Sequence, residues 1–248
     1  MATETSLMVV FIAAFITAVA TGLGAIPLIW ARQVSVYWLG VGAAVASGMM
    51  LAASHSLVEE ANGIGPWRGL LGIGTGLVVV VLANRWIEHR GAPDVGDLVG
   101  ADARKALLIL GVMTIHSFAE GIGVGVSYGG GQTLGVYITT AIAVHNIPEG
   151  LAIALVMVPR GTSVAKAALW AIFTSLPQPL MALPAYILVI AFEPFLPVGL
   201  GLAAGAMIWM VFAELLQDAN DHLQPSQMGV VVLLAFMAMM ALQFALPH

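Results

Sequence analysis

The chain has 248 residues, of which 60% are hydrophobic and 8% charged, with a formal net charge of −5 and no cysteine. A soluble domain carries about 25% charged residues. This composition therefore excludes an ordinary soluble protein and predicts a protein embedded in a lipid bilayer. The lack of cysteine excludes disulfides and thiolate metal sites, and the small net charge gives no sign of a nucleic-acid partner.

Long apolar stretches follow one another along the chain. A helix needs about 20 apolar residues to cross the hydrocarbon core of a bilayer. In chain order we predict eight membrane-spanning helices, over 6–30, 35–60, 66–88, 104–128, 132–158, 163–192, 196–217 and 226–246. The alternating ten-residue strands of a membrane β-barrel are not found in the sequence. The predicted fold is therefore an all-α membrane protein with a single transmembrane domain, residues 1–248.

The basic residues predict how the spans are oriented. All of the eight Lys and Arg residues except Arg68 lie in or beside the loops that follow spans one, three and five. Cytoplasmic loops are enriched in Lys and Arg. These loops are therefore expected in the cytoplasm, and both termini outside.

Two spans carry ionisable residues near their middles. The fourth contains "HSFAEG", with His116 and Glu120, and the fifth contains "HNIPEG", with His145 and Glu149, 29 residues further on. A charged side chain at the centre of a bilayer costs at least about 2.5–3.5 kcal/mol, so such residues indicate a functional site. Residues four apart share one helix face, and a short turn joins the two spans, so the four side chains are expected to converge.

Two imidazoles and two carboxylates form a ligand set for one divalent cation. Their nitrogen and oxygen atoms suit tetrahedral Zn²⁺, with Fe²⁺, Mn²⁺ and Cd²⁺ as alternatives. Two carboxylates in a medium of low dielectric repel each other, so we expect protons to occupy the empty site and to compete with the metal. The structural alternative is that each His bonds the Glu of its own helix and only ties the bundle together.

Prolines interrupt two of the spans. Pro148 lies inside "HNIPEG" and removes one backbone hydrogen bond of its helix, which predicts a kink and an opening for an ion path. In span six, "PQP" places Gln178 between two prolines of another broken helix. Gln178 can coordinate a metal ion or form a hydrogen bond with a carboxylate. Ser117 and Asn146, each next to a histidine, can add oxygen ligands at an adjoining position.

Further ionisable residues lie near the ends of spans. The two clusters are His55, Glu59 and Glu60 at the predicted outer end of span two, and Glu214, Asp218 and His222 at the predicted cytoplasmic end of span seven. A solvated helix end explains each cluster without any function. The functional interpretation is an entrance that gathers cations outside and an exit that receives them inside.

The two histidine motifs resemble those of the ZIP (Zrt-, Irt-like) family of divalent metal transporters, especially its prokaryotic branch. The number of spans and the outside termini agree with this resemblance over nearly the whole chain. The resemblance implies a primary metal site at His116, Glu120, His145 and Glu149, and a second, bridged position at Ser117, Asn146 and Gln178. The chain departs from the family at that second position. Span six often supplies a Glu where Gln178 stands, and Ser117 replaces a stronger ligand, which argues against a well-occupied second metal.

The resemblance also implies a mechanism and a location. An elevator-like movement of the site-bearing helices past a scaffold would carry the metal through the cell (plasma) membrane toward the cytoplasm. Glu214 resembles an acidic position of the family where a metal rests on its way out. The implied substrate is Zn²⁺ or another divalent transition metal, without an organic cofactor. The expected partners are metal ions and the lipid bilayer, not nucleic acid, and the oligomeric state stays open, a homodimer included.

A passive metal channel and an intramembrane metalloenzyme are the alternatives. The motifs do not distinguish a carrier from a channel. A metalloprotease would need H-E-x-x-H, and a di-iron bundle would need Glu-x-x-His pairs. The sequence contains neither motif, so we do not expect an enzyme.

Overall fold

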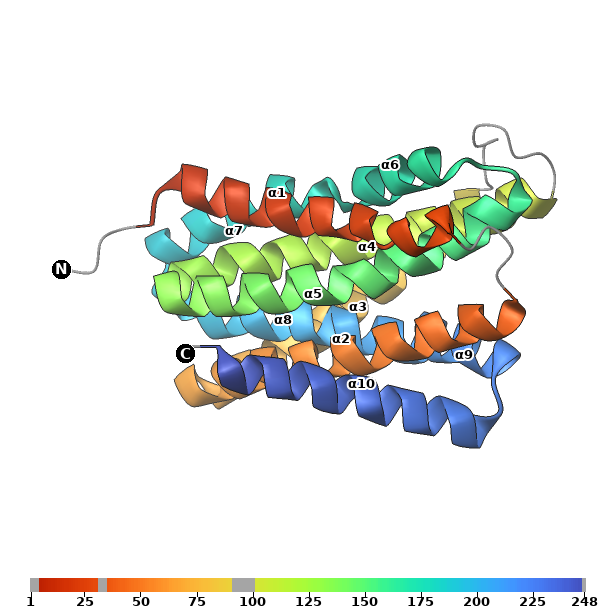
Figure 1. Cartoon of the computed structure of the whole chain (residues 1–248). Coiled ribbons are helices and arrows are strands. Elements are labelled where there is room, and N and C mark those ends of the chain that lie inside the picture. The colour runs from red at the N-terminus through yellow and green to blue at the C-terminus, as the bar shows by residue number, and fades with distance from the viewer. Residues whose placement is uncertain (1–4, 31–34, 91–100, 247–248) are drawn as a thin grey trace.

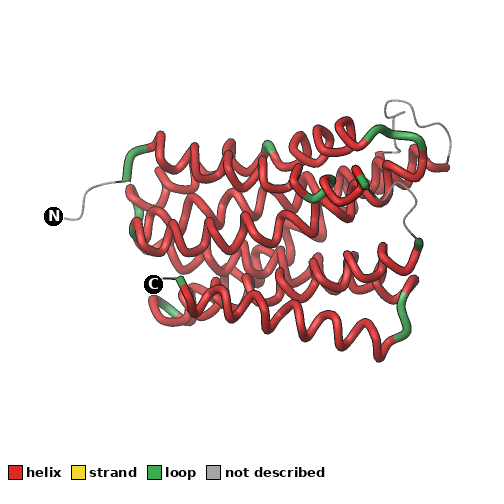
Figure 2. The backbone as a smooth tube through the Cα atoms, in the orientation of Figure 1, coloured by secondary structure: helices red, strands yellow, loops and turns green. Residues whose placement is uncertain are grey.

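Every regular element in the described part of the chain is a helix. The computed structural model describes residues 5–30, 35–90 and 101–246, and the backbone in these ranges is helical almost throughout (Figure 2). The helices lie side by side in one bundle (Figure 1). The prediction of an all-α membrane fold is confirmed.

The described residues form ten α-helices. In chain order they are α1 (Leu7–Leu23), α2 (Val36–Ile64), α3 (Pro66–Arg90), α4 (Ala101–Gly130), α5 (Gln132–Met157), α6 (Val164–Ser175), α7 (Pro177–Ala191), α8 (Leu196–Met210), α9 (Leu216–His222) and α10 (Pro225–Ala245). The short turns between them are η1 (Ile26–Ile29), η2 (Val158–Arg160), η3 (Glu193–Phe195) and a π-helical turn, η4 (Val211–Leu215).

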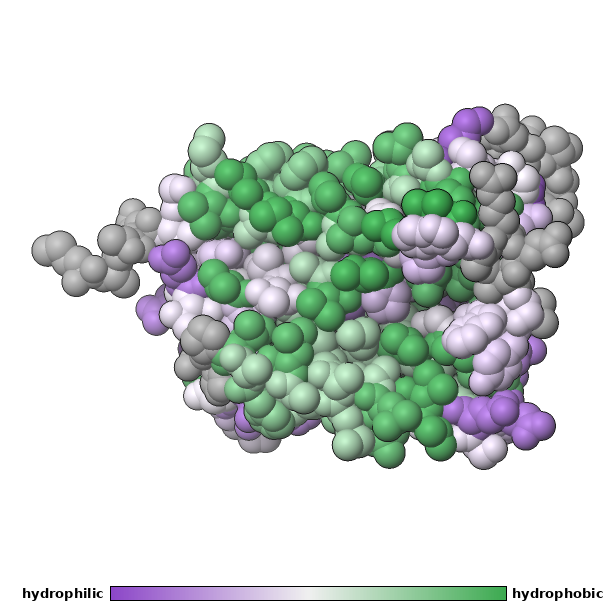
Figure 3. Space-filling model, in the orientation of Figure 1, coloured by the Kyte–Doolittle hydropathy of each residue, from purple (hydrophilic) through white to green (hydrophobic). Residues whose placement is uncertain are grey.

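Most of these helices, alone or joined end to end, form stretches long and apolar enough to cross a bilayer. Seven stretches in the described residues qualify, over Leu7–Ile29, Tyr37–Ile64, Pro66–Arg85, Gln132–Arg160, Val164–Ala191, Glu193–His222 and Pro225–Ala245. The fourth predicted span falls on α4, where the side chains of 101–109 lie outside the described residues, so the expected number of eight is not matched one for one. Apolar side chains cover the middle of the visible face and hydrophilic ones gather at its two ends (Figure 3), as expected for a surface in lipid.

Helix α1 begins and helix α10 ends at the same end of the bundle (Figure 1). We call this the terminal end. The expectation that it faces the outside stays a prediction. Part of the basic loops on which that prediction depends, at 31–34 and 91–100, lies outside the described residues.

The helices pack as two groups. In the first, which we call the site-bearing group, α4 packs on α7, and α1 packs on α5, α6 and α7. In the second, the supporting group, α3 packs on α8, and α2 packs on α8, α9 and α10. The two groups meet mainly where α4 lies against α8 and where α2 lies against α5.

Glycines bring helices into backbone contact inside each group. A Cβ on Gly150 of α5 would lie 1.6 Å from the backbone oxygen of Thr21 in α1, and one on Gly76 of α3 would lie 2.1 Å from that of Leu202 in α8. At Gly123, where α4 meets the supporting group, a Cβ would first meet a side-chain atom of Ala203, at 3.3 Å. The glycines therefore give close helix packing within the groups.

The two proline sites differ in the structure. Helix α6 ends at Ser175 and a new helix begins at Pro177, where the missing amide hydrogen is not needed. Helix α5, by contrast, continues through Pro148 to Met157. The predicted interruption is therefore found in span six, whereas Pro148 does not interrupt its helix. One lost hydrogen bond is tolerated there because α1 and α4 pack against α5.

Candidate metal centre

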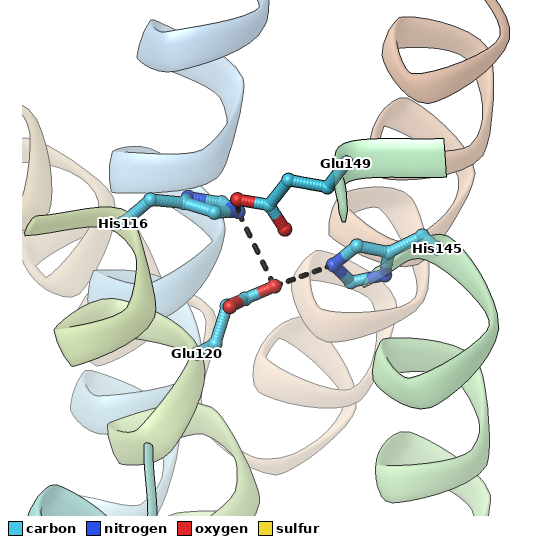
Figure 4. Close-up of side chains that lie close together, drawn as sticks. All are labelled: His116, Glu120, His145 and Glu149. Carbon is cyan, nitrogen blue, oxygen red and sulfur yellow. Dashed lines mark hydrogen bonds and ion pairs between the residues drawn. The ribbon is translucent and has the colours of Figure 1, made fainter. Parts of the chain in front are cut away.

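Four ionisable side chains of α4 and α5 meet in the interior of the bundle. His116 and Glu120 come from α4, His145 and Glu149 come from α5, and each is at most 1% exposed. Each offers one ligand atom, and the four atoms lie within 4.8 Å of one another (Figure 4). The i, i+4 spacing places each pair on one helix face, and the turn at Gly131 makes the two helices neighbours. The structure thus brings together the four residues predicted from the motifs.

The carboxylate of Glu120 lies between the two histidines. His145 Nε2 is 2.7 Å from Glu120 Oε1, and His116 Nε2 is 3.2 Å from the same oxygen. The other ring nitrogen of His145 lies 3.1 Å from the backbone oxygen of Ala141. A proton on that nitrogen leaves the Nε2 lone pair free for a cation. Because His145 pairs with the Glu of the other helix, the alternative in which each His bonds its own Glu does not describe His145, and only His116 lies close to the Glu of its own helix.

Several ligand atoms of the centre have no hydrogen-bond partner. Neither ring nitrogen of His116 makes a hydrogen bond, and Glu149 Oε2 makes none, while Glu149 Oε1 lies 4.0 Å from His116 Nε2. Four ligand atoms at about 2.0–2.2 Å from one tetrahedral Zn²⁺ would lie about 3.3–3.6 Å apart. Small side-chain rotations would therefore close this pocket around one ion. The donor set, with two carboxylates and two imidazoles, fits a single divalent cation in charge and in chemistry.

Each glutamate of the two motifs is followed by a glycine for the same physical reason. A Cβ on Gly121 would lie 2.5 Å from the backbone oxygen of Gln178 in α7. The corresponding atom on Gly150 would overlap the backbone oxygen of Thr21 in α1. Without these side chains, α7 and α1 approach closely beside the two carboxylates. The same glycines therefore bring further polar groups to the centre.

Gln178 occupies the adjoining position and bonds Glu120. Its Nε2 donates to Glu120 Oε2 at 2.5 Å, and its Oε1 accepts from the Thr17 hydroxyl. Asn146 Nδ2 donates to the Thr17 backbone oxygen at 3.0 Å and lies 3.4 Å from Gln178 Oε1. Ser117 Oγ and Asn146 Oδ1 are buried without a partner. A neutral amide thus stands where a carboxylate would offer a second negative ligand.

Thr17 is the member of this network that the sequence interpretation missed. It lies in the first apolar span, is fully buried and contacts Gln178. Thr21, one turn later, bonds Ser175 through its hydroxyl at 2.8 Å. Two hydroxyls spaced i, i+4 in an apolar span were the available signal.

Two of the three predicted entrance residues line one cavity. Glu59 and Glu60 line a cavity of about 310 Å³ at the terminal end. The His55 side chain is 55% exposed and lies 3.9 Å from the Glu59 carboxylate, but it does not line that cavity.

The predicted exit residues lie in η4 and α9, which follow each other along the chain. Glu214 lies in the π-helical turn, and Asp218 and His222 follow at intervals of four residues on α9. His222 Nδ1 lies 2.8 Å from the backbone oxygen of Asp218. Helix α9 lies at the end of the bundle opposite to the terminal end (Figure 1).

Comparison with known proteins identifies the family to which the chain belongs. Residues 87–246 match the family described as ZIP Zinc transporter. The chain belongs to the ZIP family. It is 32% identical over 241 residues to Zinc transporter ZIPB of Bordetella bronchiseptica, which covers 92% of this chain and 78% of that protein. It is 31% identical over 222 residues to Zinc transporter GufA of Myxococcus xanthus, with 84% of this chain and 87% of that protein covered.

A plant relative is more similar and much longer. "Putative zinc transporter At3g08650" of Arabidopsis thaliana is 47% identical over 229 residues, which are 91% of this chain and 37% of the plant protein. Membership of the ZIP family confirms the resemblance stated from the motifs. It also assigns the chain to a family of transporters rather than enzymes.

Proposed function

We propose that this ZIP protein transports divalent transition-metal ions, with Zn²⁺ as the main substrate, across the plasma membrane toward the cytoplasm. The observation that carries the proposal is the set of four buried ligand atoms within 4.8 Å of one another. Ionisable groups at membrane depth are costly and mark ion pathways. The names of the bacterial relatives, both zinc transporters, support the same substrate.

The proposed mechanism is elevator-type alternating access rather than a continuous pore. Every residue of the centre, and the Thr17, Asn146 and Gln178 network beside it, belongs to the site-bearing group. That group can carry its ligands as one unit, since its helices are joined by backbone contacts and interhelical hydrogen bonds. The supporting group provides the surface past which it moves. Broken helices around a midplane site are typical of such transporters.

The donor set favours Zn²⁺ without excluding its neighbours. Imidazole and carboxylate ligands suit Zn²⁺, and Fe²⁺, Mn²⁺ and Cd²⁺ are proposed as competing substrates. Because Gln178 donates to Glu120, we assign one tightly bound ion to the centre. The adjoining position at Ser117, Asn146 and Gln178 is then a weak second position.

Zn²⁺ uptake into proteoliposomes tests the proposal. We expect His145→Ala and Glu149→Ala each to abolish uptake while the protein still purifies as a folded species. Ser54→Ala is the matched control, because Ser54 is buried in the supporting group and bonds only its own helix, at 2.8 Å; its uptake should equal that of the unchanged protein. Normal uptake by either centre variant would contradict the assignment.

Carrier and channel differ in how the rate depends on metal. A carrier saturates with increasing Zn²⁺ and is accelerated by Zn²⁺ on the opposite side, whereas a channel shows neither property. Linear, unaccelerated uptake would favour the channel.

Surface labelling of an epitope at either terminus of the expressed protein tests the outside termini and the plasma-membrane location. The mass of the solubilised protein distinguishes a monomer from a homodimer.

A further inference from the structure

A small cavity at the terminal end is lined by polar groups that the centre does not use. It has a volume of about 310 Å³ and lies where α2, α5 and α10 meet, with Ser56, Glu60, Tyr137 and Gln243 among its lining residues. Tyr137 is eight residues before His145 on α5, which is about 12 Å along the helix axis. The cavity is therefore separate from the centre and lies on its terminal side.

Gln243 is the informative residue of this cavity. Its side chain is 1% exposed, and neither its Oε1 nor its Nε2 has a hydrogen-bond partner. A buried amide without partners is unfavourable, and such a group in a folded protein calls for a ligand or water. Gln243 lines the cavity directly, so that ligand would lie in the cavity.

The other polar groups of the cavity are oxygens. The Tyr137 hydroxyl donates to Ser56 Oγ at 3.1 Å, and the Ser56 hydroxyl donates to the backbone oxygen of Ala52 at 3.4 Å. The Glu60 carboxylate supplies a negative charge. Glu60 also lines a second cavity of about 720 Å³ at the same end, together with Tyr128, Gln132 and Tyr186. The carboxylate therefore lies between a wide vestibule and the smaller cavity.

We propose that the smaller cavity is a loading site for a hydrated divalent cation. Glu60 would bind the cation, Gln243 Oε1 would be a direct or water-bridged ligand, and the hydroxyls of Ser56 and Tyr137 would bond its water. A set made only of oxygens suits hard or still hydrated cations such as Mn²⁺, in contrast to the nitrogen-containing centre. The ion would be captured with its water at the terminal end and lose that water at the centre. This inference deepens the proposed function and rests on it.

Mn²⁺ binding in a background without a working centre tests this inference separately from transport. Free Mn²⁺ is counted by its electron paramagnetic resonance signal during titration of the purified full chain. The Glu149→Ala protein should still bind Mn²⁺ at the loading site. Adding Gln243→Leu should weaken that binding at least tenfold, whereas adding Ser54→Ala, a change in α2 outside the cavity, should leave it unaltered.

Gln243→Glu keeps the carbonyl oxygen and adds a charge, so in the same background it should tighten Mn²⁺ binding at least threefold. It also keeps the inference testable if the Leu variant does not fold. In proteins with an intact centre, Gln243→Leu should raise the KM for Zn²⁺ uptake several-fold with little change in maximal rate.

Three results would overturn the loading site. The first is loss of all Mn²⁺ binding in Glu149→Ala, and the second is unchanged binding after Gln243→Leu, as expected if the cavity holds water only. The third is unchanged or weaker binding after Gln243→Glu. None of them depends on whether the protein transports Zn²⁺, so a failure of the proposed function is recognised independently, by wild-type uptake in the His145→Ala variant.

Discussion

Hydrogen bonds between buried polar groups of different helices gather in the site-bearing group, apart from the Tyr137–Ser56 bond that crosses to the supporting group. In the supporting group, Ser47 donates at 2.8 Å to the carbonyl four residues earlier in its own helix. In the site-bearing group, Thr21 bonds Ser175 of another helix at 2.8 Å. Asn146 likewise donates to the backbone of Thr17 across a helix interface, at 3.0 Å. A bond within one helix satisfies a hydroxyl without fixing a neighbour, whereas a bond between helices fixes their relative position.

This difference follows from what each group has to hold. A metal centre needs its ligands held within about half an ångström, and interhelical hydrogen bonds supply that restraint around Glu120. The supporting group has no such centre in its described residues. Backbone contacts at glycines such as Gly76 and Gly205 suffice to pack it. The comparison suggests that the buried His and Glu side chains and the interhelical bonds that position them are confined to one group, as the proposed elevator movement requires.

A covalent link between the two groups should have the largest effect, because it prevents one group from moving relative to the other. The chain has no cysteine, so cysteine pairs can be introduced without background. A Cβ on Gly123 would lie 3.3 Å from the Cβ of Ala203, near the distance of about 3.5–4.5 Å in disulfides. We expect oxidised Gly123→Cys/Ala203→Cys to lose nearly all Zn²⁺ uptake, and reduction to restore it.

The matched control joins two helices of one group. A Cβ on Gly69 of α3 would lie 3.0 Å from the Cβ of Ala61 in α2. Oxidised Ala61→Cys/Gly69→Cys should therefore keep its uptake. Full uptake by the oxidised cross-group pair would show that the groups do not need to move.

The next largest expected effect is that of pH on Zn²⁺ affinity, because protons compete with the metal at side chains of one group. All buried His and Glu side chains among the described residues belong to the site-bearing group. Metal ligands must be deprotonated to bind, so Zn²⁺ affinity should fall as the pH falls. Each proton displaced by the ion weakens binding about tenfold per pH unit below the pH at which that ligand titrates. Calorimetric titrations between about pH 7.5 and 5.5 would measure this slope. A Zn²⁺ affinity that does not change with pH would contradict the His/Glu centre.

The meeting of the four His and Glu side chains was predictable from the sequence because a bilayer makes ionisable side chains costly. His116 and Glu120 could be paired with the second motif by i, i+4 spacing and a short turn alone. The pairing across helices could not be predicted. Whether His145 meets Glu120 or Glu149 depends on how α5 is rotated about its axis, which is set by packing against other helices.

The fold, like the site, was predictable only in part. Apolar length indicated membrane helices, but not their division into two groups, which depends on which glycines face which neighbours. Pro148 and Pro177 look alike in the sequence, yet only Pro177 begins a new helix. Continuity at Pro148 depends on the packing of α5 between its neighbours, which local sequence does not encode.

A glycine-to-alanine substitution in each group should lower stability by a similar amount but affect Zn²⁺ binding differently. This effect is expected to be smaller than those of the disulfide and of pH. Gly150→Ala and Gly76→Ala both place a Cβ within about 2 Å of a backbone oxygen. Overpacking typically costs about 1–3 kcal/mol, so both should unfold more readily in detergent. Only Gly150→Ala should also weaken Zn²⁺ binding, because Gly150 adjoins Glu149.

Gly74→Ala is the control for these two changes, because no atom lies within 4 Å of the Cβ it would introduce. Its thermal unfolding should match that of the unchanged protein. Equal losses of Zn²⁺ affinity in Gly150→Ala and Gly76→Ala would contradict the assignment of the centre to one group.

The smallest expected effect concerns the adjoining position inside the site-bearing group. Gln178→Glu replaces the amide that donates to Glu120 at 2.5 Å with a second carboxylate, and the two repel unless a cation or proton lies between them. We expect this variant to bind a second Zn²⁺, counted by native mass spectrometry. Thr17→Val is the control, since it removes the hydroxyl contact to Gln178 without adding charge, and should leave the number of bound ions unchanged. Equal stoichiometry in Gln178→Glu and the unchanged protein would show that the position lacks the remaining ligands for a metal. Ser117 and Asn146 would then serve packing alone, and the centre would be built for a single ion whichever residue stands at 178.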